Sequence, residues 1–225
     1  MKFRQLILLV ALTIGFVTFC FAQPRNYDIR NGFALGGGIT QFDIKTDNFT
    51  TEKGNGWMLH ASATGDLPHR WYNLSYGMQL SESSFGILAS NGTASAEFID
   101  YKVFAAQLAF LFHIKAIPNL LTIDVGPMAQ FNGKMALEDD AKEDYIINGY
   151  TNLLAQDLED ITPFNLNGAI GATLGFKFLK IRAQYIYGFL NSFEKLNDQD
   201  LNLGNNSEKL KGNMNMLAFT ALITF

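Results

Sequence analysis

The C-terminal segment constrains the fold of this chain more than any other stretch. Counting back from Phe225, every second residue is apolar, namely Ile223, Ala221, Phe219 and Leu217. A period of two is the signature of a strand with two unlike faces. Termini of soluble domains are usually polar and frayed, whereas the outer face of a membrane β-barrel contacts lipid along the strand. The segment therefore predicts the closing strand of a membrane barrel.

The N-terminus has the features of a secretory signal peptide. Two basic residues precede an uncharged stretch, 6–19, which is followed by the small residue Ala22. This order is that of a cleaved export signal, and the stretch is shorter than the roughly 20 residues of a spanning helix. We expect residues 1–22 to be removed and residues 23–225 to form one domain. An uncleaved N-terminal anchor is the alternative.

The composition excludes several classes of protein. The single cysteine, Cys20, lies within the signal, so the mature chain has neither a disulfide framework nor a cysteine metal site. Without the signal, 15 basic residues face 21 acidic ones, which argues against a nucleic-acid partner. The 20 glycines, 20 phenylalanines and 8 tyrosines, with no second run long enough for a spanning helix, favour an all-β protein.

Seven further segments show the period of two. Pro127 interrupts one of them, and because proline cannot donate a hydrogen bond to the sheet, we expect a bulge there. The complete set of expected strands is 33–41, 57–64, 72–81, 96–113 (with the alternation in its lower half, 103–113), 121–132, 165–177, 181–189 and 213–225.

The connections between these segments alternate in length. Outer-membrane barrels combine short periplasmic turns with long extracellular loops, and a closed ring leaves no exposed edge. The sequence therefore predicts an eight-stranded antiparallel, up-and-down transmembrane β-barrel with both termini on the periplasmic side. Tight turns are expected at 66–70, 115–119 and 178–180, and long polar loops at 45–55, 82–95, 133–161 and 191–212.

The second face of each strand indicates which side is outside. If the aromatic face pointed inward, solvent would meet small residues such as Gly36, Gly126 and Gly171 in place of the charges of a soluble surface. If the aromatic face meets lipid, the small and polar residues fill the lumen, which in an eight-stranded barrel has room only for side chains. We therefore expect an outer-membrane location, with lipid and lipopolysaccharide as neighbours.

The mature chain resembles the outer membrane β-barrel domain proteins of Bacteroidetes, the PorT-like or "porin family" group. The resemblance rests on the signal peptide, the glycine-rich segment 33–41, the stretch HIKAIPNLLTIDVGP (113–127) and the terminal Phe225. It implies an outer-membrane barrel, and some relatives serve the type IX secretion system. The shared motifs are architectural, so no catalytic or ligand-binding residue is carried over. As in similar proteins, Phe225 is expected to be an assembly signal for the barrel-assembly machinery.

Four polar residues are expected together on the inner face near the periplasmic turns: His113, Asp124, Lys177 and Arg182. Charges in so confined a space are costly unless they are paired. The set is therefore either a structural network of salt bridges that plugs the barrel or a gate that rearranges to pass small ions. No serine or cysteine is obviously placed beside His113, so we do not expect it to be a catalytic base.

A second polar set, His60, Ser62 and Ser75, also faces the lumen. A lipase would need these groups at the lipid edge, so we expect them to form hydrogen bonds in the core. The sequence has no phosphate-binding loop and no histidine cluster with metal-ligand spacing. We therefore predict no cofactor, no metal and no enzymatic activity.

The loop after the fifth expected strand is strongly acidic. Its apolar residues recur at near-helical spacing, which suggests a short amphipathic helix. The loop is a solvated surface, a docking face for a protein, or a place where divalent cations bridge to lipopolysaccharide phosphates. One basic residue, Lys142, accompanies the acidic residues Glu138, Asp139, Asp140, Glu143, Asp144, Asp157, Glu159 and Asp160.

The functional expectation follows from the architecture. We expect an integral outer-membrane protein with a structural, adhesive or envelope-interaction role, exercised through its extracellular loops and without catalysis. The alternatives are an accessory component of a type IX-like secretion machine, which the resemblance permits, and a narrow gated channel for small solutes.

Overall fold

The computed structural model describes residues 30–225 except 93–94, 177, 200 and 204–208. The expected signal peptide, residues 1–22, and Lys177 lie outside the described residues. No helix in the described part of the chain is long and apolar enough to cross a membrane.

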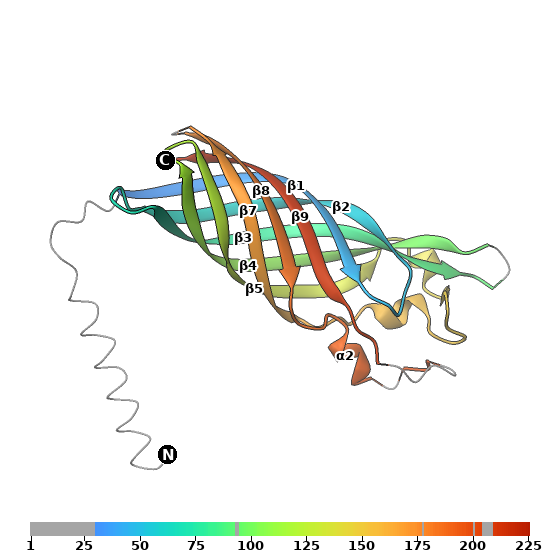
Figure 1. The fold of residues 1–225 in the computed structure, drawn as a ribbon. Helices are drawn as coiled ribbons and strands as arrows, with labels where there is room; N and C mark the ends of the chain where they lie inside the picture. The colour runs from blue at the N-terminus through green and yellow to red at the C-terminus, as the bar shows by residue number, and fades with distance from the viewer. Residues whose placement is uncertain (1–29, 93–94, 177, 200, 204–208) are drawn as a thin grey trace, which may run out of the picture.

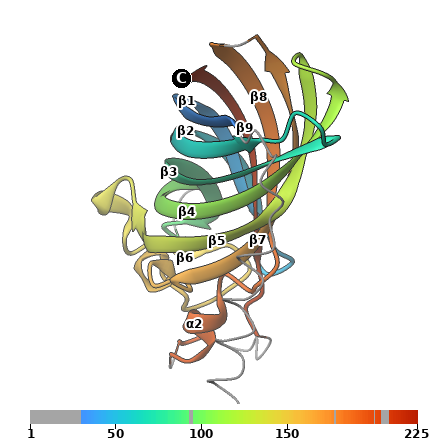
Figure 2. The same ribbon diagram turned by 90° about the vertical axis from the view of Figure 1, so that its left-hand side faces the viewer.

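Eight antiparallel strands form a closed ring, which confirms the predicted barrel (Figure 1). Strands that follow one another in the sequence pair around the ring, and β1 pairs with β9 to close it. Figure 2 shows this succession from a second direction. The ring strands are β1 (Arg30–Lys45), β2 (Thr51–Asp66), β3 (Tyr72–Ser90), β4 (Glu97–Ile117), β5 (Leu121–Leu137), β7 (Phe164–Gly175), β8 (Leu179–Gly188) and β9 (Asn213–Thr224).

The seam between β1 and β9 closes the ring as the sequence predicts. Its register includes the pair Ala34↔Thr224, and Phe225 continues it by donating its N–H to the carbonyl of Phe33 at 2.8 Å. Gly38 lies where the two backbones approach closely, since a Cβ added there would overlap the carbonyl oxygen of β9 residue 219. Glycine is therefore required at this point of the seam.

The two faces of the barrel wall have the predicted orientation. Large apolar side chains are exposed on the outside, and small or polar residues at alternate positions are buried in the lumen. The exposed set includes Phe33, Leu35, Ile39, Leu59, Tyr76, Met78, Leu108, Phe110, Val125, Ile170, Ile181, Phe219 and Ile223.

Two of the expected long loops are mostly strand. β3 continues to Ser90 and β4 begins at Glu97, and the two strands pair without a register shift over this extension. Figure 1 shows the hairpin reaching beyond the rest of the barrel. Similarly, β2 begins at Thr51, so a short connection joins it to β1. The expected loops 45–55 and 82–95 are therefore wrong in extent.

The reason is that the two faces exchange polarity along β3 and β4. Beyond Ser83 the inward side chains of β3 are apolar, with Phe85 and Ile87 fully buried, and the inward Tyr101 of β4 is buried with them. Outward positions there are polar, such as Asp100 and Lys102. An outer wall that meets water carries polar side chains, so the apolar-outside pattern ends although the strand does not.

The expected bulge at Pro127 is also wrong. β5 keeps its register with β7 through the pair Pro127↔Gly168, and β4 and β5 share one register on either side of the proline. Pro127 is exposed on the outer face of the wall. The register of β5 against β4 shifts elsewhere, between Val103 and Ala105 and beside Lys115.

The two ends of the barrel are closed differently. Short turns join the strands at the end that carries the C-terminus, here called the turn end (Figure 1). The opposite end, the loop end, carries the remaining connections with η1 (Asp140–Lys142), η2 (Ala155–Leu158) and α2 (Glu194–Asn197). A two-residue strand, β6 (Ile146–Ile147), pairs with the end of β3.

The acidic loop does not form the expected amphipathic helix. The segment consists of η1, β6 and η2, and Gly149 turns the chain between β6 and η2 with φ 93°, a conformation that favours glycine. Its apolar residues Ile147, Leu153 and Leu158 are fully buried. Burying them against the end of the barrel requires an irregular path, whereas a regular surface helix would keep them on one stripe.

An apolar core that the sequence pattern did not predict fills the loop end of the lumen. The ring of Phe49 lies 5.5 Å from that of Phe193 and 5.7 Å from that of Tyr150, so three different loops meet there. The lumen therefore has two layers, one apolar at the loop end and one polar toward the turn end. The apolar layer includes Phe42, Ile44, Phe49, Phe85, Ile87, Tyr101, Met135, Tyr150, Leu153, Leu158, Phe193, Leu196 and Leu210.

Candidate functional site in the polar lumen

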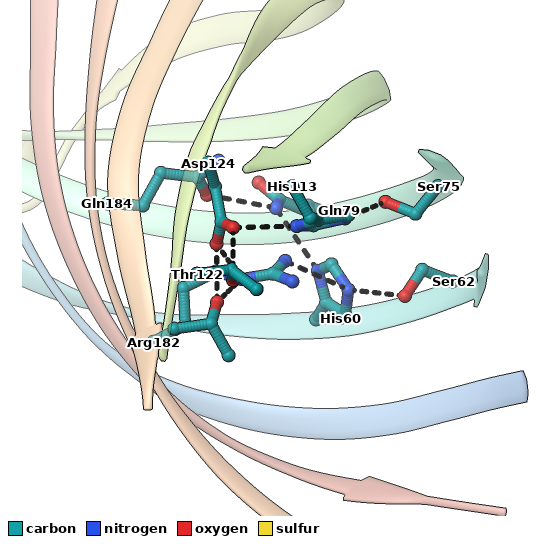
Figure 3. A network of polar contacts seen from close by, with 10 residues as sticks. His60, Ser62, Ser75, Gln79, His113, Thr122, Asp124, Arg182 and Gln184 are labelled. Carbon is teal, nitrogen blue, oxygen red and sulfur yellow. Dashed lines mark hydrogen bonds and ion pairs between the residues drawn. The ribbon is translucent and has the colours of Figure 1, made fainter. Parts of the chain in front are cut away.

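Asp124 lies at the centre of the polar layer, and Figure 3 shows its partners. Its Oδ1 accepts hydrogen bonds from His113 Nδ1 at 2.7 Å and from Thr122 Oγ1 at 2.7 Å. Its Oδ2 accepts a hydrogen bond from Thr173 Oγ1 and lies 3.3 Å from Arg182 Nε. Asp124 is 1% exposed. These partners stabilise a carboxylate that has lost its water.

The strand register explains why these groups meet. His113 of β4 is the direct partner of Asp124 on β5, and Thr173 of β7 is the direct partner of Arg182 on β8. Direct cross-strand partners point to the same face at the same height. The structure thus brings together three of the four residues expected in one layer, namely His113, Asp124 and Arg182. The fourth, Lys177, lies outside the described residues.

Arg182 connects this layer to the second polar set. Its Nη1 lies 3.5 Å from His60 Nε2, and His60 Nε2 lies 2.9 Å from Ser62 Oγ. The other ring nitrogen of His60 lies 3.1 Å from Gln79 Nε2, which also donates to Gln184 Oε1 at 3.2 Å. All five side chains are buried. The two polar sets, which the sequence pattern does not connect, form one network.

Ser75 lies beside His113, contrary to expectation. Its Oγ is 2.7 Å from His113 Nε2, so Ser75, His113 and Asp124 follow the order of a serine hydrolase relay. Such an enzyme also needs space for an acyl group at Oγ and donors for its oxyanion. Ser75 is 3% exposed, and neither it nor His113 lines the cavity at the turn end. With Ser75 covered in this way, its hydrogen bond serves to orient the ring of His113.

A separate group of amides lies within the lumen. Gln107 Nε2 and Asn167 Nδ2 each donate to Gln130 Oε1 at 2.6 Å, and Gln130 Nε2 donates to Asn132 Oδ1 at 2.6 Å. Gln130 Nε2 also lies 3.2 Å from the sulfur of Met214, which belongs to the apolar layer. These amides therefore join the polar layer to the apolar one.

The eight acidic residues of the loop after β5 do not form one site. Glu138 pairs with Lys102 at 2.9 Å and Asp160 with Lys195 at 2.6 Å. The hydrogen bond from Lys195 holds the pKa of the Asp160 carboxyl below its usual range. Within the described ranges, no group of three or more His, Cys, Asp or Glu side chains could hold a metal ion.

The other six acidic residues are of three kinds. Asp139 and Asp157 accept hydrogen bonds from backbone N–H groups of their own loop. Glu159 is half-buried, whereas Asp140, Glu143 and Asp144 are exposed. The exposed carboxylates, together with Asp139 and Glu138, give the loop its acidic surface.

Comparison with known proteins finds similarity in structure only. No protein-family model and no curated protein sequence matches the chain. Among solved structures, neisserial surface protein A (NspA) is 9% identical, with 86% of this chain and 97% of that chain covered and a TM-score of 0.47. The outer membrane protein OprG from Pseudomonas aeruginosa is 11% identical, with 88% and 97% covered and a TM-score of 0.47.

Proposed function

We propose that this protein is an integral outer-membrane barrel that presents a folded, acidic cap at the cell surface and acts without catalysis. The observation that carries the proposal is the apolar layer at the loop end. It closes the lumen and at the same time anchors the loops, because Phe49, Tyr150 and Phe193 pack together within it. The connections after β1, β5 and β8 thereby form one platform, which is the cap.

The outer wall supports a place in a membrane. Many of its largest side chains are apolar and exposed, and Ile39 and Tyr76 are 67% and 69% exposed. Exposed apolar surface costs about 25 cal/mol per Å² in water, and an apolar band of this extent marks a surface that meets lipid. The closed ring satisfies its backbone groups internally, as a spanning structure must. Lipid and lipopolysaccharide are accordingly its proposed neighbours.

Hydrogen bonds between loops support the platform. Asn48, in the connection after β1, accepts from Lys211 N at 2.8 Å, close to the start of β9. Asn191, after β8, donates to the carbonyl of Leu210 at 2.9 Å. The ion pair of Lys195 with Asp160 joins the loop after β8 to the loop after β5. A cap with such links offers a fixed surface for adhesion or for a partner of the envelope.

The cap can be tested by neutralising its exposed carboxylates. In a variant with Asp139, Asp140, Glu143 and Asp144 changed to the corresponding amides, we expect normal folding and loss of proteins that co-purify with the wild type in mild detergent. A control variant that neutralises Glu52, at the loop end of β2, should keep the co-purifying proteins. If the wild type and both variants co-purify with the same proteins, the acidic surface has no such role. Recovery of a set of secretion components with the wild type would favour the secretion-machine alternative.

The channel alternative is tested separately. The apolar layer and the paired Asp124 and Arg182 fill the lumen, so we expect no discrete conductance steps in a planar bilayer. Steps that disappear in an Arg182→Ala variant would show that the polar layer is a gate and would overturn the closed-lumen proposal.

A further inference from the structure

A cavity of about 320 Å³ lies at the turn end of the barrel, opposite the cap. Thr122 and Thr173 line it and also donate hydrogen bonds to Asp124, so the polar network closes its inner end. The cavity is therefore a blind vestibule. Its volume lies at the lower end of the roughly 300–1,000 Å³ of pockets that hold small organic ligands.

The vestibule contains two lysines with different surroundings. Lys115 donates to the carbonyl of Leu67 at 2.8 Å and pairs with Asp66 at 3.3 Å. Lys180 is half-buried on the inner face of β8 and has no ion pair with any residue that the structure describes. A partly desolvated ammonium group without a directly paired carboxylate is unfavourable. An anion in contact with Lys180 would reduce this cost.

The remaining lining combines polar and apolar groups. Asn73 and Thr64 are polar groups of the wall, and the Oδ1 of Asn73 already accepts a hydrogen bond from Leu67 N, which leaves its NH₂ group as a donor. Leu120 and Phe176 contribute apolar surface at the rim. Polar groups that orient a ligand, combined with apolar surface, are the usual construction of a small-molecule site.

We propose that the vestibule binds a small aliphatic carboxylate, with its carboxylate at Lys180 and its carbon chain against Leu120 and Phe176. A monoanion matches the site, because Lys115 is already paired with Asp66 and Lys180 is the lining lysine that lacks an ion pair with the described residues. A phosphate dianion would carry one charge more than Lys180 supplies and would not use the apolar rim. The inference is independent of the surface role, since the vestibule and the cap lie at opposite ends of the barrel.

The experiment measures hexanoate binding to the mature protein in detergent micelles, by calorimetry and by saturation-transfer NMR, with empty micelles as the blank. Lys180→Gln should weaken binding at least about tenfold, which is what loss of a charge-assisted hydrogen bond implies. Lys180→Arg should stay within about threefold of the wild type, as the charge is kept. Lys195→Gln, at the loop end, is the matched control and should bind as the wild type does.

Two probes and one further variant separate the contributions. Hexanol, which lacks the charge, and acetate, which lacks the chain, should each bind at least about tenfold more weakly than hexanoate. Ala34→Leu fills the vestibule from β1 and should abolish binding without altering Lys180. Equal affinity of hexanol and hexanoate, or full binding by Ala34→Leu, would overturn the proposal even if Lys180→Gln failed to fold.

Discussion

Replacing Asp124 by asparagine tests the most heavily constrained point of the barrel. The amide keeps the shape of the carboxylate but loses its charge, and it replaces one accepting oxygen by an NH₂ group that donates. Depending on how the amide turns, this NH₂ group lies beside the hydroxyl of Thr173 and the guanidinium of Arg182, or beside the hydroxyl of Thr122 and the ring of His113. The substitution therefore leaves a buried positive charge without its partner.

The magnitude follows from the burial of the pair. Asp124 is 1% and Arg182 5% exposed, so water cannot replace the lost carboxylate. Breaking a buried ion pair by removing one partner costs about 3–5 kcal/mol. We expect Asp124→Asn to lower the free energy of unfolding by this amount. Because the penalty comes from the stranded Arg182, the double variant Asp124→Asn with Arg182→Gln should lose less than the sum of the two single variants.

The assay is urea unfolding of the protein folded into detergent micelles, followed by tryptophan fluorescence. Asp66→Asn is the matched control, because Asp66 pairs with Lys115 at the same end but its side chain is 42% exposed. Exposed pairs contribute about 0–1 kcal/mol, so this variant should remain near the wild type. A loss below about 1 kcal/mol for Asp124→Asn, or equal losses for both variants, would refute the view that the lumen is held by a buried, paired charge.

Four further outcomes are expected. Gly38→Val should prevent closure of the seam, because its side chain would overlap the backbone of β9, and should yield little heat-modifiable protein on a gel. Phe193→Ala should destabilise the cap by about 3–5 kcal/mol and speed proteolysis of the loop after β8, while the barrel stays resistant. Since the pKa of Asp160 is lowered by Lys195, their contact should contribute stability above the unfolded carboxyl pKa and be lost as pH falls through the lowered value, and Asp160→Asn should abolish this dependence in loop proteolysis. Deletion of Phe225, the proposed assembly signal, should reduce surface yield more than the stability of folded protein, and normal yield would contradict that role.

The strands within the apolar band could be predicted because their pattern is local. In β9, Phe219 and Ile223 are exposed while the alternating Thr220 and Leu222 are buried, as the sequence indicates. The same pattern failed beyond Ser83 of β3, where the outer wall becomes polar and the inner wall apolar. Alternation reports the contrast between two environments, and it cannot show that the environments have exchanged.

The polar network could be predicted only in part. The placement of His113, Asp124 and Arg182 near the turns follows from alternation and turn length. The link of Arg182 to His60, at 3.5 Å, crosses the lumen between strands that are distant in the sequence. The contact of Ser75 with His113 depends on the register between β3 and β4, in which His113 is the partner of residue 73. A correct prediction of that register would have located Ser75 beside His113.

The sequence alone determined the class of the fold, the number of strands and which face of the wall is apolar, because each strand carries its own alternation. Tertiary structure decided how the lumen is filled. Whether an inward residue meets a charge, an amide or a phenyl ring depends on the register of the whole closed ring and on loops that fold back into it. For that reason the barrel could be foreseen, whereas the apolar core beneath the cap and the vestibule beside Lys180 could not.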